Sequence, residues 1–187
     1  MPNIDMPNGL KPIRDAAGTP FNGALEMVHI PVADATPLFI GDPVVKNGSA
    51  DANGVASAIR AAAAGPISGV VQGFVPDGTT DMVGYRAAST AAYALVCADP
   101  DAMFVVQGNG VLTAADIGLN ASMTIANGTV LTRRSAVQLD LATKATTVTL
   151  PLKIMGILQV PNNEVGAAAK LVVKINLHTD APASAGV

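Results

Sequence analysis

Turn-forming residues interrupt this chain at short intervals and leave no room for a long helix. Glycine tolerates a positive φ and proline fixes φ, so pairs containing them favour tight turns. The clearest pairs are Asp42-Pro43, Asn53-Gly54, Gly65-Pro66 and Asn127-Gly128. Short runs rich in Val, Ile and Thr lie between the turn signals, and such runs favour strands. The pattern predicts an all-β protein with a β-sandwich or jelly-roll-like domain.

The expected strands follow from these interruptions. They lie within residues 26–32, 44–46, 55–63, 67–75, 85–86, 91–98, 102–107, 122–126, 129–133, 146–160 and 170–178. In the last run, Val172, Lys174 and Asn176 fall on one face, and the other face carries Leu171, Val173, Ile175 and Leu177. That alternation is typical of a strand with one face toward solvent. Thr113 is a candidate N-cap for a single helical turn.

The first 22 residues differ from the rest of the chain, because four prolines (Pro2, Pro7, Pro12 and Pro20) keep the backbone extended there. We interpret residues 1–22 as an extended N-terminal arm, 23–180 as a β-sandwich domain and 181–187 as a flexible C-terminal tail. We expect the arm to supply little of the core and to dock on a neighbouring molecule; the alternative is a disordered tail. The candidate contact residues are Ile4, Met6, Leu10, Ile13 and Phe21.

The composition favours a protein whose surface is itself partly covered. Hydrophobic residues make up 50% and charged residues 13% of the chain, against about 25% charged in a typical domain. Soluble monomers rarely expose large apolar patches, so these values favour a homo-oligomer, and we expect a trimer. The net charge of −3 and 3% aromatic content argue against nucleic acid as a partner. No apolar run approaches the roughly 18 residues that a membrane span needs.

Residues for catalysis or for a cofactor are not evident. The histidines, His29 and His178, have no Cys, Asp or Glu at ligand spacing, and a metal site needs three or four converging ligands. Cys97 lies in an apolar run and is interpreted as a buried, unreactive thiol. Gly108-Asn109-Gly110 lacks the features of a phosphate-binding loop. We therefore expect no enzyme activity, no catalytic residue, no metal and no cofactor. The N-terminus has no signal-peptide pattern, which predicts synthesis in a cytoplasm.

A set of ordered motifs carries a resemblance to a known class of proteins. They are GLKPIRDAAGTPFNG, ATPLFIGDPVVKNGSADANGV, GVVQGFVPD, YRAASTAAYALVCADPDAMFVVQ, DIGLNA and LPLKIMGILQVPNNEVGAAAKLVVKINLH. Together they span about Gly9 to His178, and in this respect the chain resembles the capsid decoration, or cement, proteins of tailed phages and prophages.

The resemblance implies a structural virion protein that is assembled in the host cytoplasm. Such a protein would bind the outside of an icosahedral capsid, commonly as a trimer, and bridge subunits of the major capsid protein. Two alternatives remain open: another virion component, such as a head fibre or spike base, or a small β-barrel module that binds a ligand. The long spine helix expected of a major capsid protein is not readable in this sequence.

Overall fold

The computed structural model describes residues 3–76 and 84–181. Most of the expected C-terminal tail, residues 182–187, lies outside the described residues. The strands are β1 (Lys11–Asp15), β2 (Glu26–Ile30), β3 (Leu38–Phe39), β4 (Pro43–Ala50), β5 (Ala56–Arg60), β6 (Gly69–Phe74), β7 (Tyr85–Arg86), β8 (Ala92–Cys97), β9 (Ala102–Asn109), β10 (Asn120–Thr124), β11 (Gln138–Ala145), β12 (Leu152–Ile157) and β13 (Lys170–Ile175). The one-turn 3-10 helix η1 (Ala114–Asp116) follows Thr113, as expected. The predicted all-β class is confirmed.

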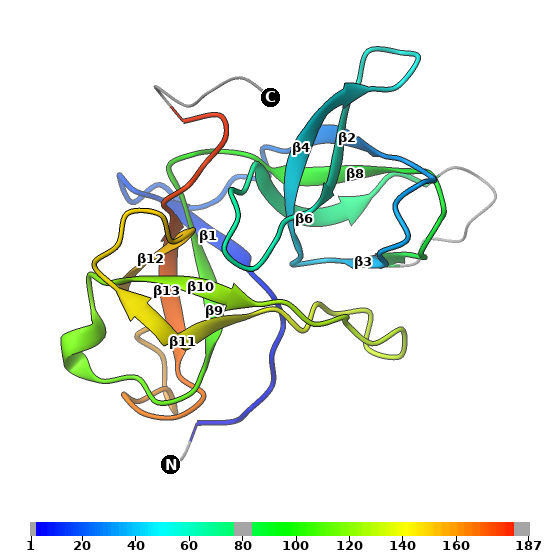
Figure 1. Ribbon diagram of the computed structural model, residues 1–187. Helices are drawn as coiled ribbons and strands as arrows, with labels where there is room; N and C mark the ends of the chain where they lie inside the picture. Colours follow the sequence, from blue (N-terminus) through cyan, green and yellow to red (C-terminus); the bar gives the residue numbers. More distant parts are fainter. Residues whose placement is uncertain (1–2, 77–83, 182–187) are drawn as a thin grey trace.

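Strands from the second half of the chain form one closed barrel. Its order is β9-β11-β10-β12-β13, and antiparallel pairing between β13 and β9 closes it. Strand β1 is added to the same sheet by antiparallel pairing with β9. The pairing of β11 with β9 is parallel, whereas the other pairings in this barrel are antiparallel. We call this unit, with β1, the large barrel (Figure 1).

Strands from the first half form a second closed barrel, in the order β2-β5-β4-β6-β8. Here too one pairing, β2 with β5, is parallel. The short strands β3 and β7 pair with each other beside it. We call this unit the small barrel (Figure 1).

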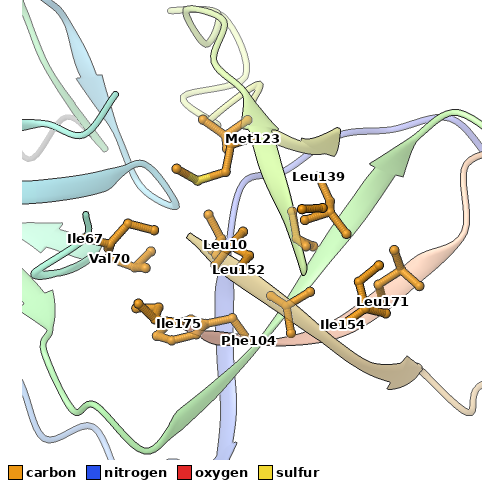
Figure 2. Close-up of a cluster of buried hydrophobic side chains, with 14 of the residues drawn as sticks. Leu10, Ile67, Val70, Phe104, Met123, Leu139, Leu152, Ile154, Leu171 and Ile175 are labelled. Atoms are coloured by element: carbon orange, nitrogen blue, oxygen red, sulfur yellow. The ribbon is translucent and has the colours of Figure 1, made fainter. Parts of the chain in front are cut away.

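The main hydrophobic core fills the large barrel and extends toward the small one. Figure 2 shows Phe104, Leu152 and Ile154 packed together with Leu171 nearby, and Ile67 and Val70 from the small-barrel side lie against the same cluster. Residues at the junction, such as Ile67 and Val70, therefore belong to the main core, while the rest of the small barrel has a core of its own. Leu10 from the expected arm is fully buried in this core, so this residue departs from the expectation that the arm supplies little of it.

Most of the strands predicted from the sequence are confirmed. In β13, Leu171, Val173 and Ile175 are buried as expected, but Val172, expected on the solvent face, is buried too. Two predicted segments are wrong. Residues 129–133 form a compact turn, since the Arg133 N–H donates to the Thr129 carbonyl at 2.8 Å. Residues 146–150 are also irregular, because the Asn176 side chain binds the carbonyls in this segment instead of a partner strand. Strand β10 pairs with β12 and with β11, and the sequence reasoning did not identify β11 as a strand.

Candidate interaction surface

Residues 3–8, here called the N-terminal strap, lie on the large barrel and are fixed at two points. The first is Asn3, whose Nδ2 donates to the carbonyls of Glu164 and Ala167 at 2.8 and 2.7 Å. The Glu164 N–H donates back to Asn3 Oδ1 at 2.9 Å. One amide side chain thus ties the beginning of the strap to the loop between β12 and β13.

The second point is Gln107, a buried residue of β9. Its Oε1 accepts the Met6 N–H at 2.9 Å, and its Nε2 donates to Asp5 Oδ1 at 2.6 Å. The amide of Gln107 is therefore satisfied by the strap itself, as a buried polar group requires. Asn3 and Gln107 together fix the backbone of the strap by hydrogen bonds and leave the apolar side chains of Ile4 and Met6 exposed to solvent.

The five candidate contact residues are placed very differently. Ile4 is 71% exposed and Met6 is 54% exposed, so both are accessible to another molecule. Leu10 is fully buried and is not accessible to a partner. Ile13 and Phe21 are half-buried, and Phe21 packs against the main core. Among the five, only Ile4 and Met6 combine an anchored backbone with a largely exposed apolar side chain.

Tight packing where the two barrels meet fixes the far end of the strap. Gly9 has φ +63°, and a Cβ there would lie only 2.4 Å from the Gly41 carbonyl oxygen. Leu10 N–H donates to that same carbonyl at 2.9 Å. Any side chain at residue 9 would collide with Gly41. Glycine at this position therefore lets the chain turn from the exposed strap to the buried Leu10 within one residue.

A second exposed apolar site lies at the tip of the long loop between β10 and β11. Leu131 is 93% exposed and Val130 is 58% exposed. Figure 1 shows this loop extending from the large barrel and passing below β3 of the small barrel, at a different edge of the molecule from the N-terminus, and Arg134 at its base bridges to Ile40. The loop is folded back on itself by a bridge between Thr129 and Arg134. The strap and this loop tip thus present apolar side chains at two separate places.

Two cavities flank the strap and differ in charge. One, of about 500 Å³, is lined by the carboxylate-bearing residues Asp5 and Glu164 together with the Gly108–Gly110 segment. The other, of about 390 Å³, is lined by the cations Lys11, Arg134 and Lys170. Sequence reasoning did not identify either cavity, because their residues come from segments that are distant along the chain.

The histidines lie in hydrogen-bonded settings rather than in a reactive centre. His29 Nδ1 lies 3.0 Å from Ser57 Oγ, and the His29 ring contacts Tyr93. An imidazole so placed can in principle take a serine proton, but Ser57 is only 3% exposed and a substrate has no access to its hydroxyl. His178 is buried, and burial lowers the pKa of its imidazole. Cys97 is buried as predicted, and burial raises the pKa of its thiol.

Within residues 3–76 and 84–181, no three His, Cys, Asp or Glu side chains gather as a metal site would require. No helix in the described part of the chain is long and apolar enough to cross a membrane. Comparison of the sequence and structure with protein-family models, with curated proteins and with solved structures gave no match.

Proposed function

We propose that this protein is a structural component of a phage virion that binds the outside of an icosahedral capsid and bridges subunits of its major capsid protein. The observation that carries the proposal is the anchored strap, on which Ile4 and Met6 are held exposed by Asn3 and Gln107. Apolar side chains fixed at a surface lose little entropy on binding and are typical contact points.

The second apolar site, at Val130 and Leu131, supports a bridging role. A molecule with two separate contact sites gains from the high effective concentration of the second site once the first is bound. Binding to the assembled shell but not to its dissociated subunits stabilises the shell by mass action. The same argument favours a homo-oligomer, and a trimer would multiply the number of contacts further.

The alternative of a small ligand-binding module is favoured by one observation, the two cavities beside the strap. Their volumes, about 500 and 390 Å³, fall in the range of small-ligand sites. Under this alternative the exposed strap and loop tip would have no role in binding a capsid. Substitutions at these two sites therefore distinguish between the two proposed functions.

The test uses capsids encoded by the same genome and purified without this protein. Full-length protein is mixed with them, and binding is measured by co-sedimentation, with heat-induced DNA release as a second readout. We expect binding by the parent chain and about tenfold weaker binding after Ile4→Ser with Met6→Ser, or after Leu131→Ser. Val148→Ser is the matched control, because Val148 is 74% exposed on an irregular segment outside both sites.

Absence of the protein from purified virions, together with no binding to such capsids, would contradict the proposal. Equal loss of binding in the Val148→Ser control would contradict the assignment of the strap and loop tip as the contacts. The expected trimer is tested separately by sedimentation at micromolar concentration, where a stable monomer would exclude it.

A further inference from the structure

The cavity beside the strap brings together three cations from distant parts of the chain. Lys11 comes from β1, Arg134 from the end of the loop before β11, and Lys170 from the start of β13. Each lines the same space of about 390 Å³. We call this space the cationic cavity.

Lys11 is close enough to Arg134 and to Lys170 for their charges to repel its ammonium group. Burial lowers the pKa of the Lys11 ammonium, and the charges of Arg134 and Lys170 lower it further. Throughout the described residues, no carboxylate forms a salt bridge with Lys11, Arg134 or Lys170. A bound anion would therefore relieve a repulsion that the chain itself leaves uncompensated.

The rest of the lining is largely apolar. Val105 and Val106 of β9 line the cavity, and Met6, Ile13 and Leu158 contribute further apolar side chains. None of the described residues that line this cavity is aromatic, so they offer no ring on which a nucleic-acid base could stack. The lining thus combines positive charge with an apolar surface and fits a carboxylate flanked by apolar groups.

We propose that the cationic cavity is a docking site for an acidic segment of a partner protein, in which Asp or Glu side chains alternate with apolar ones. The carboxylates lie among Lys11, Arg134 and Lys170, where the guanidinium can hold one in a bidentate pair. The apolar side chains of the segment pack against Met6 and Leu158. Charge complementarity carries this assignment, and it goes beyond the proposed function because it holds for a capsid subunit or for any other protein partner.

The test uses the full-length protein and a fluorescent, end-blocked peptide of alternating Leu and Glu. Binding is measured by anisotropy, with the matching Leu–Gln peptide, inorganic phosphate and a single-stranded oligonucleotide as comparison probes. We expect the Leu–Glu peptide to bind, the Leu–Gln peptide to bind at least about tenfold more weakly, and added salt to weaken the Leu–Glu complex. Phosphate should compete only weakly because it leaves the apolar lining uncovered.

Variants locate the binding site. Changing Lys11, Arg134 and Lys170 together to Gln should weaken binding of the Leu–Glu peptide by about tenfold. Lys153→Gln is the control, because Lys153 is an exposed cation on β12 outside the cavity. Changing the three cations to Glu should transfer the preference to a Leu–Lys peptide, and circular dichroism checks that each variant is folded.

Three outcomes would overturn the inference: equal affinity for the Leu–Glu and Leu–Gln peptides, equal loss of binding in the Lys153→Gln control, or binding of the oligonucleotide in preference to the peptide. Self-association that depends on the three cations would identify a second copy of this chain as the partner. That result would also replace the proposed occupant. Peptide binding that depends on the three cations, found together with no attachment to capsids, would support this inference and contradict the proposed function, so the failures of the two proposals are distinguishable.

Discussion

The large and small barrels have the same number of strands in their closed rings but are stabilised in different ways. Bulky side chains fill the large barrel, where the fully buried residues include Phe104, Leu112, Met123, Leu139, Leu152, Ile154 and Leu171. The separate core of the small barrel is built from Val28, Ile30, Leu38, Val44, Ala58, Val71, Ala94 and Val96. Because alanine and valine remove less apolar area from water, the small barrel gains less from hydrophobic burial.

A buried arginine helps to stabilise the small barrel. Arg86 of β7 is 3% exposed, and its guanidinium donates to the carbonyls of Pro31, Asp34, Thr36 and Thr90. The Asp34 carboxylate lies 3.4 Å from it. A single side chain thus joins the segment after β2 to the segment before β8. The comparison shows that two barrels with the same number of strands can differ in what stabilises them: large buried side chains in one, and smaller side chains together with arginine hydrogen bonds to backbone carbonyls in the other.

The largest effect that would test this comparison comes from removing residues 1–22, which add β1 and Leu10 to the large barrel. Deleting residues 1–22 removes β1 from the edge of β9 and removes Leu10 from the core. A buried leucine alone contributes about 2–5 kcal/mol, a large part of the 5–15 kcal/mol that stabilises a typical domain. We expect the truncated chain to lose its cooperative thermal transition, measured by far-UV circular dichroism.

Deleting only residues 1–6 is the control, since it removes Ile4 and Met6 but leaves Leu10 and β1 in place. We expect this shorter deletion to keep a cooperative thermal transition, lowered only by the loss of the hydrogen bonds of Asn3 and Gln107. A 1–22 deletion that melts like the parent would show that the large barrel does not depend on this segment.

The next effect compares the two cores directly. Phe104→Ala removes a fully buried ring from the large barrel and should lower the free energy of unfolding by about 3–5 kcal/mol. Val96→Ala removes two methyl groups from the small barrel and should cost about 1–2 kcal/mol. Urea denaturation of both variants measures the difference. Equal losses would mean that the two cores contribute alike and that the comparison fails.

Arg86→Met tests whether the hydrogen bonds of a buried arginine stabilise the small barrel. The substitution leaves four carbonyls and the Asp34 carboxylate without their donor, so we expect a loss of about 3 kcal/mol. Hydrogen exchange should rise first around residues 31–36 and 84–90, while β9 and β13 stay protected. Arg14→Met is the control: Arg14 is exposed, and its loss should cost less than about 0.5 kcal/mol. Uniform loss of protection in both barrels would contradict separate modes of stabilisation.

Much of the local structure could be predicted because turn chemistry acts over a few residues. The strands β6, β8 and β9 lie where Gly-Pro and Asp-Pro-Asp signals place them. The same reasoning fails at Asn127-Gly128, which predicts a hairpin. A Cβ at Gly128 would lie 2.1 Å from the Arg134 carbonyl oxygen and 2.7 Å from the Phe39 ring. Glycine is needed here because the segment around residue 128 packs closely against Phe39 and Arg134. A local sequence pattern cannot indicate such a contact.

The closure of the barrels and the interaction surface depend on contacts between distant residues. The parallel pairing of β11 with β9, and of β2 with β5, cannot be predicted from the spacing of the strands along the sequence. The arm residues Ile4 and Met6 were identified from their apolar character alone. Their exposure depends on Asn3 and Gln107, and Gln107 lies about a hundred residues further along the chain. For the same reason, the gathering of Lys11, Arg134 and Lys170 could not be predicted.

The smallest effect concerns Asp42, a fully buried carboxylate at the junction of the two barrels. Burial raises the pKa of Asp42, although the Phe39 N–H that donates to its Oδ2 at 2.9 Å acts in the opposite direction, as does the Ser135 hydroxyl. A folded-state pKa above the unfolded one means that the native protein binds this proton more tightly. The contribution of Asp42 to stability therefore grows as the pH falls through the folded pKa toward the unfolded value, and declines as the pH rises.

Asp42→Asn removes this titration while keeping the side chain's shape and an oxygen to accept the Phe39 N–H. At neutral pH we expect stability within about 1 kcal/mol of the parent, because a buried charge is lost together with part of its hydrogen bonding. The stability of the variant relative to the parent should then fall as the pH is lowered, as measured by urea denaturation at several pH values. Asp15→Asn is the control with the opposite sign: its backbone hydrogen bond from Thr19 lowers the pKa of Asp15, so the parent loses that contribution on acidification. A relative stability of Asp42→Asn that stays constant with pH would show that Asp42 has an ordinary pKa and that the junction imposes no cost on its charge.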